Sequence, residues 1–224
     1  MRSRPSFFSS SVGSKYLVAL SGLALVGFLV LHMAGNVLVL LSPEVFNTYG
    51  DRLVKNPLLI PAEIALLVLF VMHVYKTVRL WLGAREARPQ GYVLQRWAGH
   101  TSRKSWASST MILSGLFLLI FVPLHLATFK YGAHYLVQGE PGVRDLHRLV
   151  VEVFSQPGYV LFYSIGMVLV GFHLWHGASS AFQSIGVSSP RLGARLRLGG
   201  WVLAVVVAGG FFIIPIWVFF GGRP

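Results

Sequence analysis

The sequence of 224 residues contains no cysteine. This absence excludes disulfides, iron–sulfur ligation by thiolates and covalent haem attachment through a Cys-x-x-Cys-His motif. Any redox cofactor must therefore be held by other side chains.

Charged residues are scarce, at 12% of the sequence, whereas 54% of the residues are hydrophobic. This composition is typical of a membrane protein with several apolar stretches of about 20 residues. Acidic residues are the rarest charged type, with 7 against 19 Lys and Arg, which gives a net charge of +12. We exclude a nucleic-acid partner, because the basic residues cluster beside apolar runs and indicate contact with membrane lipid.

Five apolar runs predict an all-α membrane protein with five transmembrane helices, in one transmembrane domain covering residues 1–224. The first run is too long for a signal-peptide core and lacks an Ala-x-Ala exit, so it is predicted to be retained. We predict bends at Pro123 and Pro215 and an amphipathic helix over 143–154 on the outer surface, and we see no internal repeat strong enough to argue from. The predicted spans are 16–41, 58–82, 107–130, 158–182 and 200–220.

The connections between the spans differ in charge. Thirteen Lys and Arg fall on the side of the N-terminus, and six fall on the other side together with six of the seven acidic residues. By the positive-inside rule the N-terminus is cytoplasmic and the C-terminus is outside. We predict a multi-pass protein of the inner (cytoplasmic) membrane of the cell.

Histidine is unusually frequent inside the spans. A histidine in hydrocarbon is costly, so it normally faces a partner inside the bundle. His100, His134 and His147 fall in predicted loops and are expected to be solvated. The five histidines within spans are His32, His73, His125, His173 and His176.

Four of these histidines form two layers when their depth is estimated from the helical rise. His32 and His125 fall toward the outside, and His73 and His173 toward the cytoplasm, with roughly 15 Å between the layers. Two histidines at one depth on different helices can be the axial ligands of one haem b iron, which needs no covalent attachment. Taken singly, each histidine could instead be an interhelical hydrogen-bonding residue, a proton relay or a channel-lining group.

Other residues near the layers suit a haem site. Gly35 and Gly177 are expected to make room for the rings, and Lys76 and Arg79 to meet haem propionates. His176 is ambiguous, because it could be the ligand in place of His173, a propionate partner or a proton group.

Glu63 is the other residue of interest. At the outer start of the second span, a carboxylate favours the helix N-terminus, which is one explanation. Alternatively, Glu63 could accept or deliver quinone protons on the outer side.

Four groups of residues give a resemblance along nearly the whole chain. The chain resembles the cytochrome b membrane-anchor subunit of succinate dehydrogenase/fumarate reductase, in its single-chain, five-helix, dihaem form. The matching residues are Ser21-Gly22 with Phe28-Leu29-x-x-His32-Met33-x-Gly35-Asn36; Pro57-Leu58 with Glu63 and Phe70-x-x-His73; Trp106-Ala107-Ser108-Ser109-Thr110-Met111-x-x-Ser114-Gly115 with Phe121-x-x-x-His125-Leu126; and His173-Leu174-x-His176-Gly177-x-x-Ser180-x-Phe182-Gln183-x-x-Gly186.

This resemblance implies two haems b, with iron ligand pairs His32–His125 and His73–His173. It implies a flavoprotein and an iron–sulfur partner on the cytoplasmic face, and reaction with menaquinone or ubiquinone in the membrane. The place implied is the respiratory chain and tricarboxylic acid cycle, with dicarboxylate chemistry on another subunit. Relatives often carry Arg where this chain has Ser109, so a propionate or quinone contact is expected elsewhere, at Arg103 or Lys104.

Two alternatives stay open. One is a dihaem cytochrome b that serves a hydrogenase, formate dehydrogenase or nitrate reductase. The other is a haem-free transporter that uses its histidines as a proton relay.

Overall fold

The computed structural model describes residues 7, 10–87, 110–187 and 189–221. It confirms an all-α chain with five helices long and apolar enough to cross a membrane, and the described part contains no β-strand. The long helices are α1 (Ser11–Val37, continued by the 3-10 turn η2, Leu38–Leu40), α3 (Leu59–Glu86), α5 (Met111–His125, continued by the π-helix η4, Leu126–Lys130), α7 (Pro157–Ser184) and α8 (Pro190–Phe219).

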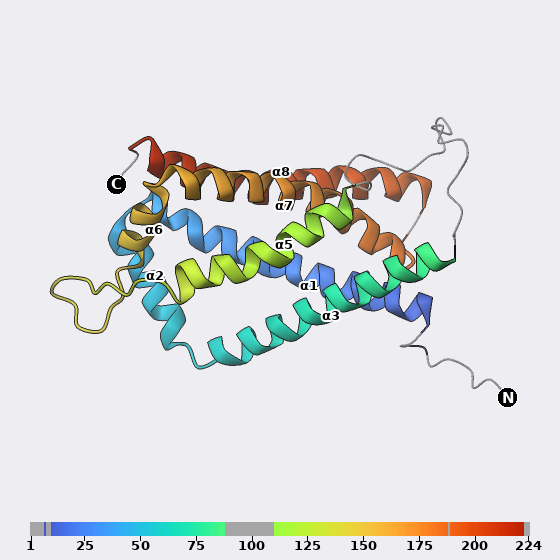
Figure 1. Cartoon of the computed structure of the whole chain (residues 1–224), viewed down its shortest axis with the longest axis horizontal. Coiled ribbons are helices and arrows are strands. Elements are labelled where there is room, and N and C mark those ends of the chain that lie inside the picture. Colours follow the sequence, from blue (N-terminus) through green and yellow to red (C-terminus); the bar gives the residue numbers. More distant parts are fainter. Residues whose placement is uncertain (1–6, 8–9, 88–109, 188, 222–224) are drawn as a thin grey trace.

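The long helices alternate in direction along the bundle. α1, α5 and α8 run one way, and α3 and α7 run back, so α1 begins and α8 ends at opposite ends (Figure 1). We call the end at which α1 begins the inner end, because the charge distribution predicts it to be cytoplasmic, and the opposite end the outer end. The orientation in the membrane stays a prediction.

The last span is longer than predicted. Ser189 caps α8 by accepting a hydrogen bond from the Leu192 N–H at 3.1 Å, so the helix begins ten residues before position 200. Three arginines expected in a loop (Arg191, Arg195 and Arg197) therefore lie in the first turns of α8. Hydropathy misses such turns, because long basic side chains can reach the membrane surface from a helix that continues past it.

Pro123 precedes a change of helix type. Proline cannot donate the hydrogen bond of an α-helix turn. Three residues later α5 passes into the π-helix η4, in which the Tyr131 N–H donates to the Leu126 carbonyl at 2.9 Å. His125 is the last α-helical residue before this change.

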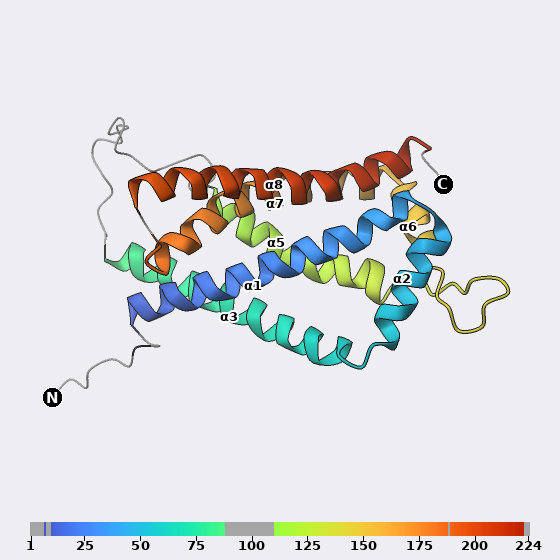
Figure 2. The same cartoon turned by 180° about the vertical axis from the view of Figure 1, so that it is seen from behind.

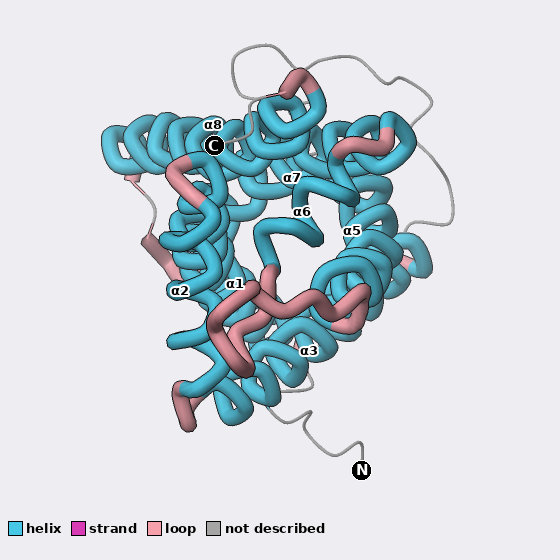
Figure 3. The backbone as a smooth tube through the Cα atoms, turned by 90° about the vertical axis from the view of Figure 1, so that its left-hand side faces the viewer, coloured by secondary structure: helices cyan, strands magenta, loops and turns pink. Residues whose placement is uncertain are grey.

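Two short helices close the outer end, α2 (Pro43–Lys55) and α6 (Leu146–Phe154). α2 was not predicted. α6 falls within the predicted segment and lies across the outer end of the bundle (Figure 3). It buries five of its nine residues while Arg148 and Glu152 stay exposed, which confirms an amphipathic helix. Asn47 of α2 joins the two helices, because its side chain donates to Asp145 and accepts from the His147 N–H, both at 2.9 Å.

His147 was expected to be solvated, and this is wrong. It lies in α6 with 8% of its surface exposed, on the face that also buries Leu149, Val150 and Val153. The helical spacing of these residues turns His147 inward. His134 is exposed, as expected, and His100 lies outside the described residues.

The helices are packed unequally. α7 and α8 lie along each other, and α1 runs beside α3, α7 and α8 (Figure 2). In contrast, α3 has no buried residue and packs mainly on α1. The core of the protein therefore lies among α1, α5, α7 and α8, with α3 at its side.

Candidate functional site

The outer histidines lie side by side. His32 on α1 and His125 on α5 have ring centroids 5.8 Å apart, with the ring planes at 85°. Two imidazole–metal bonds of about 2.0 Å would place the ligating nitrogens about 4 Å apart and the ring centroids roughly 6 Å apart. The spacing of this pair therefore fits two axial ligands of one iron.

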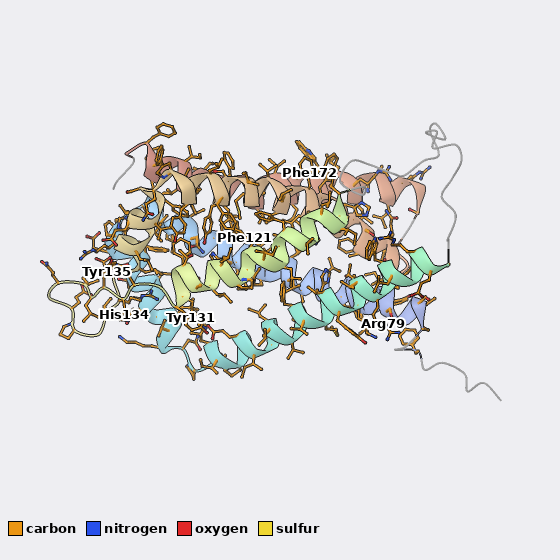
Figure 4. All side chains as sticks on the ribbon, viewed as in Figure 1. Arg79, Phe121, Tyr131, His134, Tyr135 and Phe172 are labelled. Atoms are coloured by element: carbon orange, nitrogen blue, oxygen red, sulfur yellow. The ribbon has the colours of Figure 1, made fainter. Side chains whose placement is uncertain are left out.

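Aromatic rings surround the outer histidines. Phe28 stacks on His32 with centroids 5.2 Å apart, and Phe121 stacks on His125 at 5.8 Å. Phe211, Phe129 and Tyr163 complete the surroundings. Figure 4 shows Phe121 in the middle of the bundle.

The Nδ1 atoms of the outer pair have weak polar surroundings. The Nδ1 of His125 is buried without a hydrogen-bond partner. The Nδ1 of His32 lies 3.2 Å from the side-chain nitrogen of Asn36, one turn along α1. This nitrogen also donates to the His32 carbonyl at 2.7 Å.

The inner histidines are each held by a serine on a neighbouring helix. The Nδ1 of His73 on α3 lies 3.2 Å from the Ser21 hydroxyl on α1, and the Nδ1 of His173 on α7 lies 3.2 Å from the Ser114 hydroxyl on α5. Both serines are fully buried, at 0% exposure.

The hydrogen bonds of the serines assign the histidine tautomer. Ser21 donates to the Leu17 carbonyl at 2.6 Å, and Ser114 donates to the Met111 carbonyl at 3.1 Å. The Nδ1 of His73 also lies 3.2 Å from the Val18 carbonyl, which can only accept, so this nitrogen carries the hydrogen. For His173 we adopt the same tautomer, in which Ser114 donates to Met111 and accepts from the imidazole. The Nε2 lone pair of His73 and of His173 is then available to a metal.

A glycine follows each serine and faces the same histidine. A Cβ at Gly22 would meet the His73 Cε1 at 3.1 Å, and a Cβ at Gly115 would meet the His173 Cε1 at 3.7 Å. The Ser-Gly pairs thus fit these imidazoles sterically as well as by hydrogen bonding.

Ser21 and Ser114 were not among the predicted site residues, although an internal repeat marks them. Residues 21–32 and 114–125 share the pattern Ser-Gly-Leu-x-Leu-x-x-Phe-x-x-Leu-His, with seven of twelve positions identical. The expectation of no internal repeat is therefore wrong. The eleven residues from serine to histidine put the two layers about 16 Å apart, close to the predicted separation.

The predicted glycines have different neighbours. A Cβ at Gly35 would meet the Tyr49 side chain of α2 at 2.6 Å, so this glycine makes room for a tyrosine. A Cβ at Gly177 would meet nothing within 4 Å, which leaves open space beside α7. His176, one turn beyond His173, is half-buried.

The predicted cationic residues lie at the inner end. Arg79 is exposed and lies by the Tyr75 ring, 5.9 Å from its centroid, near the start of α1 (Figure 4). Lys76 is half-buried one turn after His73. Ser109, Arg103 and Lys104 lie outside the described residues.

Glu63 forms an ion pair with Lys130, which links α3 to η4. Because α3 begins at Leu59, Glu63 lies past its first turn, and stabilisation by the helix N-terminus does not explain the residue. Both side chains are about one-third exposed. A charged pair therefore stands at the outer end, next to the π-helix that follows His125.

No group of three or more His, Asp or Glu suited to a metal ion occurs among the described residues. A metal held by two histidines needs other ligands, which a porphyrin supplies in haem. Two observations fit haem iron here: the spacing of the outer rings and the tautomer of the inner ones.

Comparisons of the chain with protein-family models, curated proteins and solved structures found no match. The functional argument therefore depends on the histidine layers and their surroundings.

Proposed function

We propose that this chain is the dihaem cytochrome b membrane anchor of a succinate:quinone oxidoreductase. It would pass electrons between an iron–sulfur partner at the inner end and quinone in the membrane. Dicarboxylate chemistry would take place on a flavoprotein subunit, so this chain contributes the electron path and quinone reaction of a larger enzyme.

The observation that carries the proposal is the repeated Ser–His pair of the inner layer. Ser21 fixes His73 and Ser114 fixes His173, at the same distance of 3.2 Å and in the same tautomer. Iron-ligating histidines have their second nitrogen bound in this manner, which orients the ring and raises the basicity of the ligating nitrogen. A proton relay needs imidazoles that can change protonation state, and a fixed Nδ1–H favours this less.

The residues of this chain would hold two haems and provide their surroundings. Bound haem would supply reversible one-electron transfer. His32 and His125 would hold the outer group and His73 and His173 the inner one, with four helices each giving one ligand. The aromatic rings around His32 and His125 would exclude water from the outer layer, and Lys76 and Arg79 would neutralise propionates at the inner end.

Glu63 is proposed to exchange protons with quinone at the outer end. It lies on α3, and its partner Lys130 belongs to the π-helix that begins after His125. Lys130 follows the proposed outer ligand His125 by five residues, and the carboxylate of Glu63 would take part in the proton uptake that quinone reduction needs.

The first test is a haem measurement on the full chain, purified from membranes after haem-replete expression. We expect a reduced-minus-oxidised b-type spectrum and two haems per chain in a pyridine haemochrome assay. Co-purified subunits then identify the complex: a flavoprotein and an iron–sulfur protein support the proposal. A folded chain without haem contradicts it and favours the proton-relay transporter.

A further inference from the structure

We propose that Ser21 and Ser114 are positioning residues that set the reduction potential of the inner haem through the Nδ1 atoms of His73 and His173. This inference rests on the proposed function, because it needs haem bound by these two histidines. The serines would contact no haem atom as ligands; they act through the imidazoles.

The geometry forms a short hydrogen-bond chain on each side of the inner layer. His73 Nδ1–H lies 3.2 Å from both the Ser21 hydroxyl and the Val18 carbonyl, and the Ser21 hydroxyl donates to the Leu17 carbonyl at 2.6 Å. Consecutive hydrogen bonds polarise each other, most strongly in a medium of low dielectric. Because the Ser21 hydroxyl donates to the Leu17 carbonyl, the hydroxyl oxygen becomes a better acceptor for the His73 imidazole.

The second side repeats this chain with different residues. His173 Nδ1–H donates to the Ser114 hydroxyl, which donates to the Met111 carbonyl at 3.1 Å. Ser21 and Ser114 are both at 0% exposure, so water does not compete for either hydroxyl. Recurrence on two separate helix pairs indicates that the arrangement serves the histidines and not one local packing problem.

The outer layer lacks this arrangement. The buried Nδ1 of His125 has no partner, and the Nδ1 of His32 lies 3.2 Å from the nitrogen of Asn36. The serines would therefore affect the reduction potential of the inner haem alone, and the potential of the outer haem serves as an internal reference.

The direction of the effect follows from the hydrogen bond. An imidazole that donates its Nδ1–H carries more electron density on Nε2, which stabilises oxidised iron relative to reduced iron. Ser21→Ala and Ser114→Ala should each shift the midpoint potential of the inner haem upward, and Ser114→Ala the more, because the Val18 carbonyl still accepts from His73 Nδ1 in Ser21→Ala. The double variant should shift it further.

The experiment is a spectroelectrochemical titration of the purified full chain. Each serine variant is made in the complete protein and in a His125→Ala background, in which only the inner haem can bind. Each haem gives one reduction wave in this titration. In the otherwise unchanged protein we expect two haems per chain, with the midpoint potential of one wave moved upward and that of the other unmoved. In the His125→Ala background we expect the single remaining wave to move upward.

Two further variants make the result specific. Ser164→Ala removes a hydroxyl from α7 that has no partner and contacts no histidine, and it should move neither wave. Ser21→Thr keeps the hydroxyl, and it should keep the inner potential closer to the original value than Ser21→Ala does.

Unmoved potentials in both serine variants, or a shift confined to the outer wave, would overturn the inference. Loss of the inner haem in Ser21→Ala, with recovery in Ser21→Thr, would support it as a positioning role. A chain without haem instead rejects the proposed function, so the two failures are distinguishable.

Discussion

The inner and outer histidine layers have the same residue type in different environments. The inner histidines are bound through Nδ1 to buried serines, whereas the outer histidines lie among phenylalanine rings. Hydrogen bonds fix the direction of a ring, and aromatic packing fixes its place. In the outer layer the Asn36 side chain adds a polar contact to the His32 Nδ1 at 3.2 Å, whereas the buried Nδ1 of His125 has no partner. The inner layer is therefore specified by polar contacts and the outer layer by shape.

The largest expected effect comes from removing a ligand in one layer. His73→Ala and His173→Ala should each remove the inner haem, and His32→Ala and His125→Ala the outer haem, so each variant retains one haem of two. Haem content and the potential of the remaining wave measure this. Loss of the inner haem in His176→Ala, together with two haems in His173→Ala, would assign the α7 ligand to His176.

Phe121 tests whether aromatic packing holds the outer layer. It is 7% exposed and touches His125, Phe117, Phe162 and Tyr163. Phe121→Ala should cost about 3 kcal/mol in the free energy of unfolding, because it leaves a cavity that the neighbouring rings cannot fill. Phe172→Ala, on an exposed phenylalanine of α7, is the control and should cost far less in a detergent unfolding assay.

Glu63 tests the proton chemistry at the outer end. Glu63→Gln should lower quinone turnover about 100-fold, because a proton-exchanging group contributes on that order. The lost ion pair with Lys130 should cost about 1 kcal/mol or less of stability. Lys130→Gln separates the two roles, since it breaks the same pair but keeps the carboxylate. Normal quinone reduction by Glu63→Gln would contradict a proton role.

Gly22 tests the fit of the inner layer. Its added Cβ would lie 3.1 Å from the His73 ring, so Gly22→Ala should displace the imidazole and cost about 1 kcal/mol. The change should broaden or shift the inner wave alone. Gly115→Ala is the matched control, because the corresponding contact of 3.7 Å is an ordinary van der Waals distance.

The smallest effect concerns acid at the outer end. Burial lowers the pKa of His147 from 6.5, although Asp145 and Glu44 oppose this shift. The unfolded chain then binds a proton more readily than the folded one, so stability should fall as the pH drops below 6.5, by less than about 1.4 kcal/mol per pH unit. Unfolding temperatures at pH 7.5 and 5.5 measure this. The pH dependence should shrink in His147→Asn and persist in His134→Asn.

Much of the bundle could be predicted, because hydropathy reports long apolar helices directly. The depths of the histidines in the bundle could also be estimated from the helical rise, and the predicted pairing of His32 with His125 agrees with their contact in the structure. The start of α8 at Pro190 was missed, since a cap at Ser189 and snorkelling arginines leave no apolar signal. α2 was missed although its start is marked in the sequence, since Ser42 precedes Pro43 and caps the helix by accepting from the Val45 N–H at 3.2 Å.

The serines of the inner layer show a different limit. Ser21 and Ser114 are among the residues that carry the resemblance, and they also begin the internal repeat, but neither pattern indicates that they bind histidines. Hydropathy predicts the helices that contain these serines, but it does not predict which histidines they contact. The Ser21–His73 bond joins residues 52 positions apart, and it depends on how α3 crosses α1.

The repeated twelve residues also bear on ancestry. α1 with α3, and α5 with α7, form two halves that run in the same directions (Figure 1). Each half carries one outer and one inner histidine, so neither half alone can complete a pair, whereas two identical halves side by side would complete both. Duplication of a two-helix unit that pairs with itself would therefore account for α1, α3, α5 and α7, with α8 as an addition.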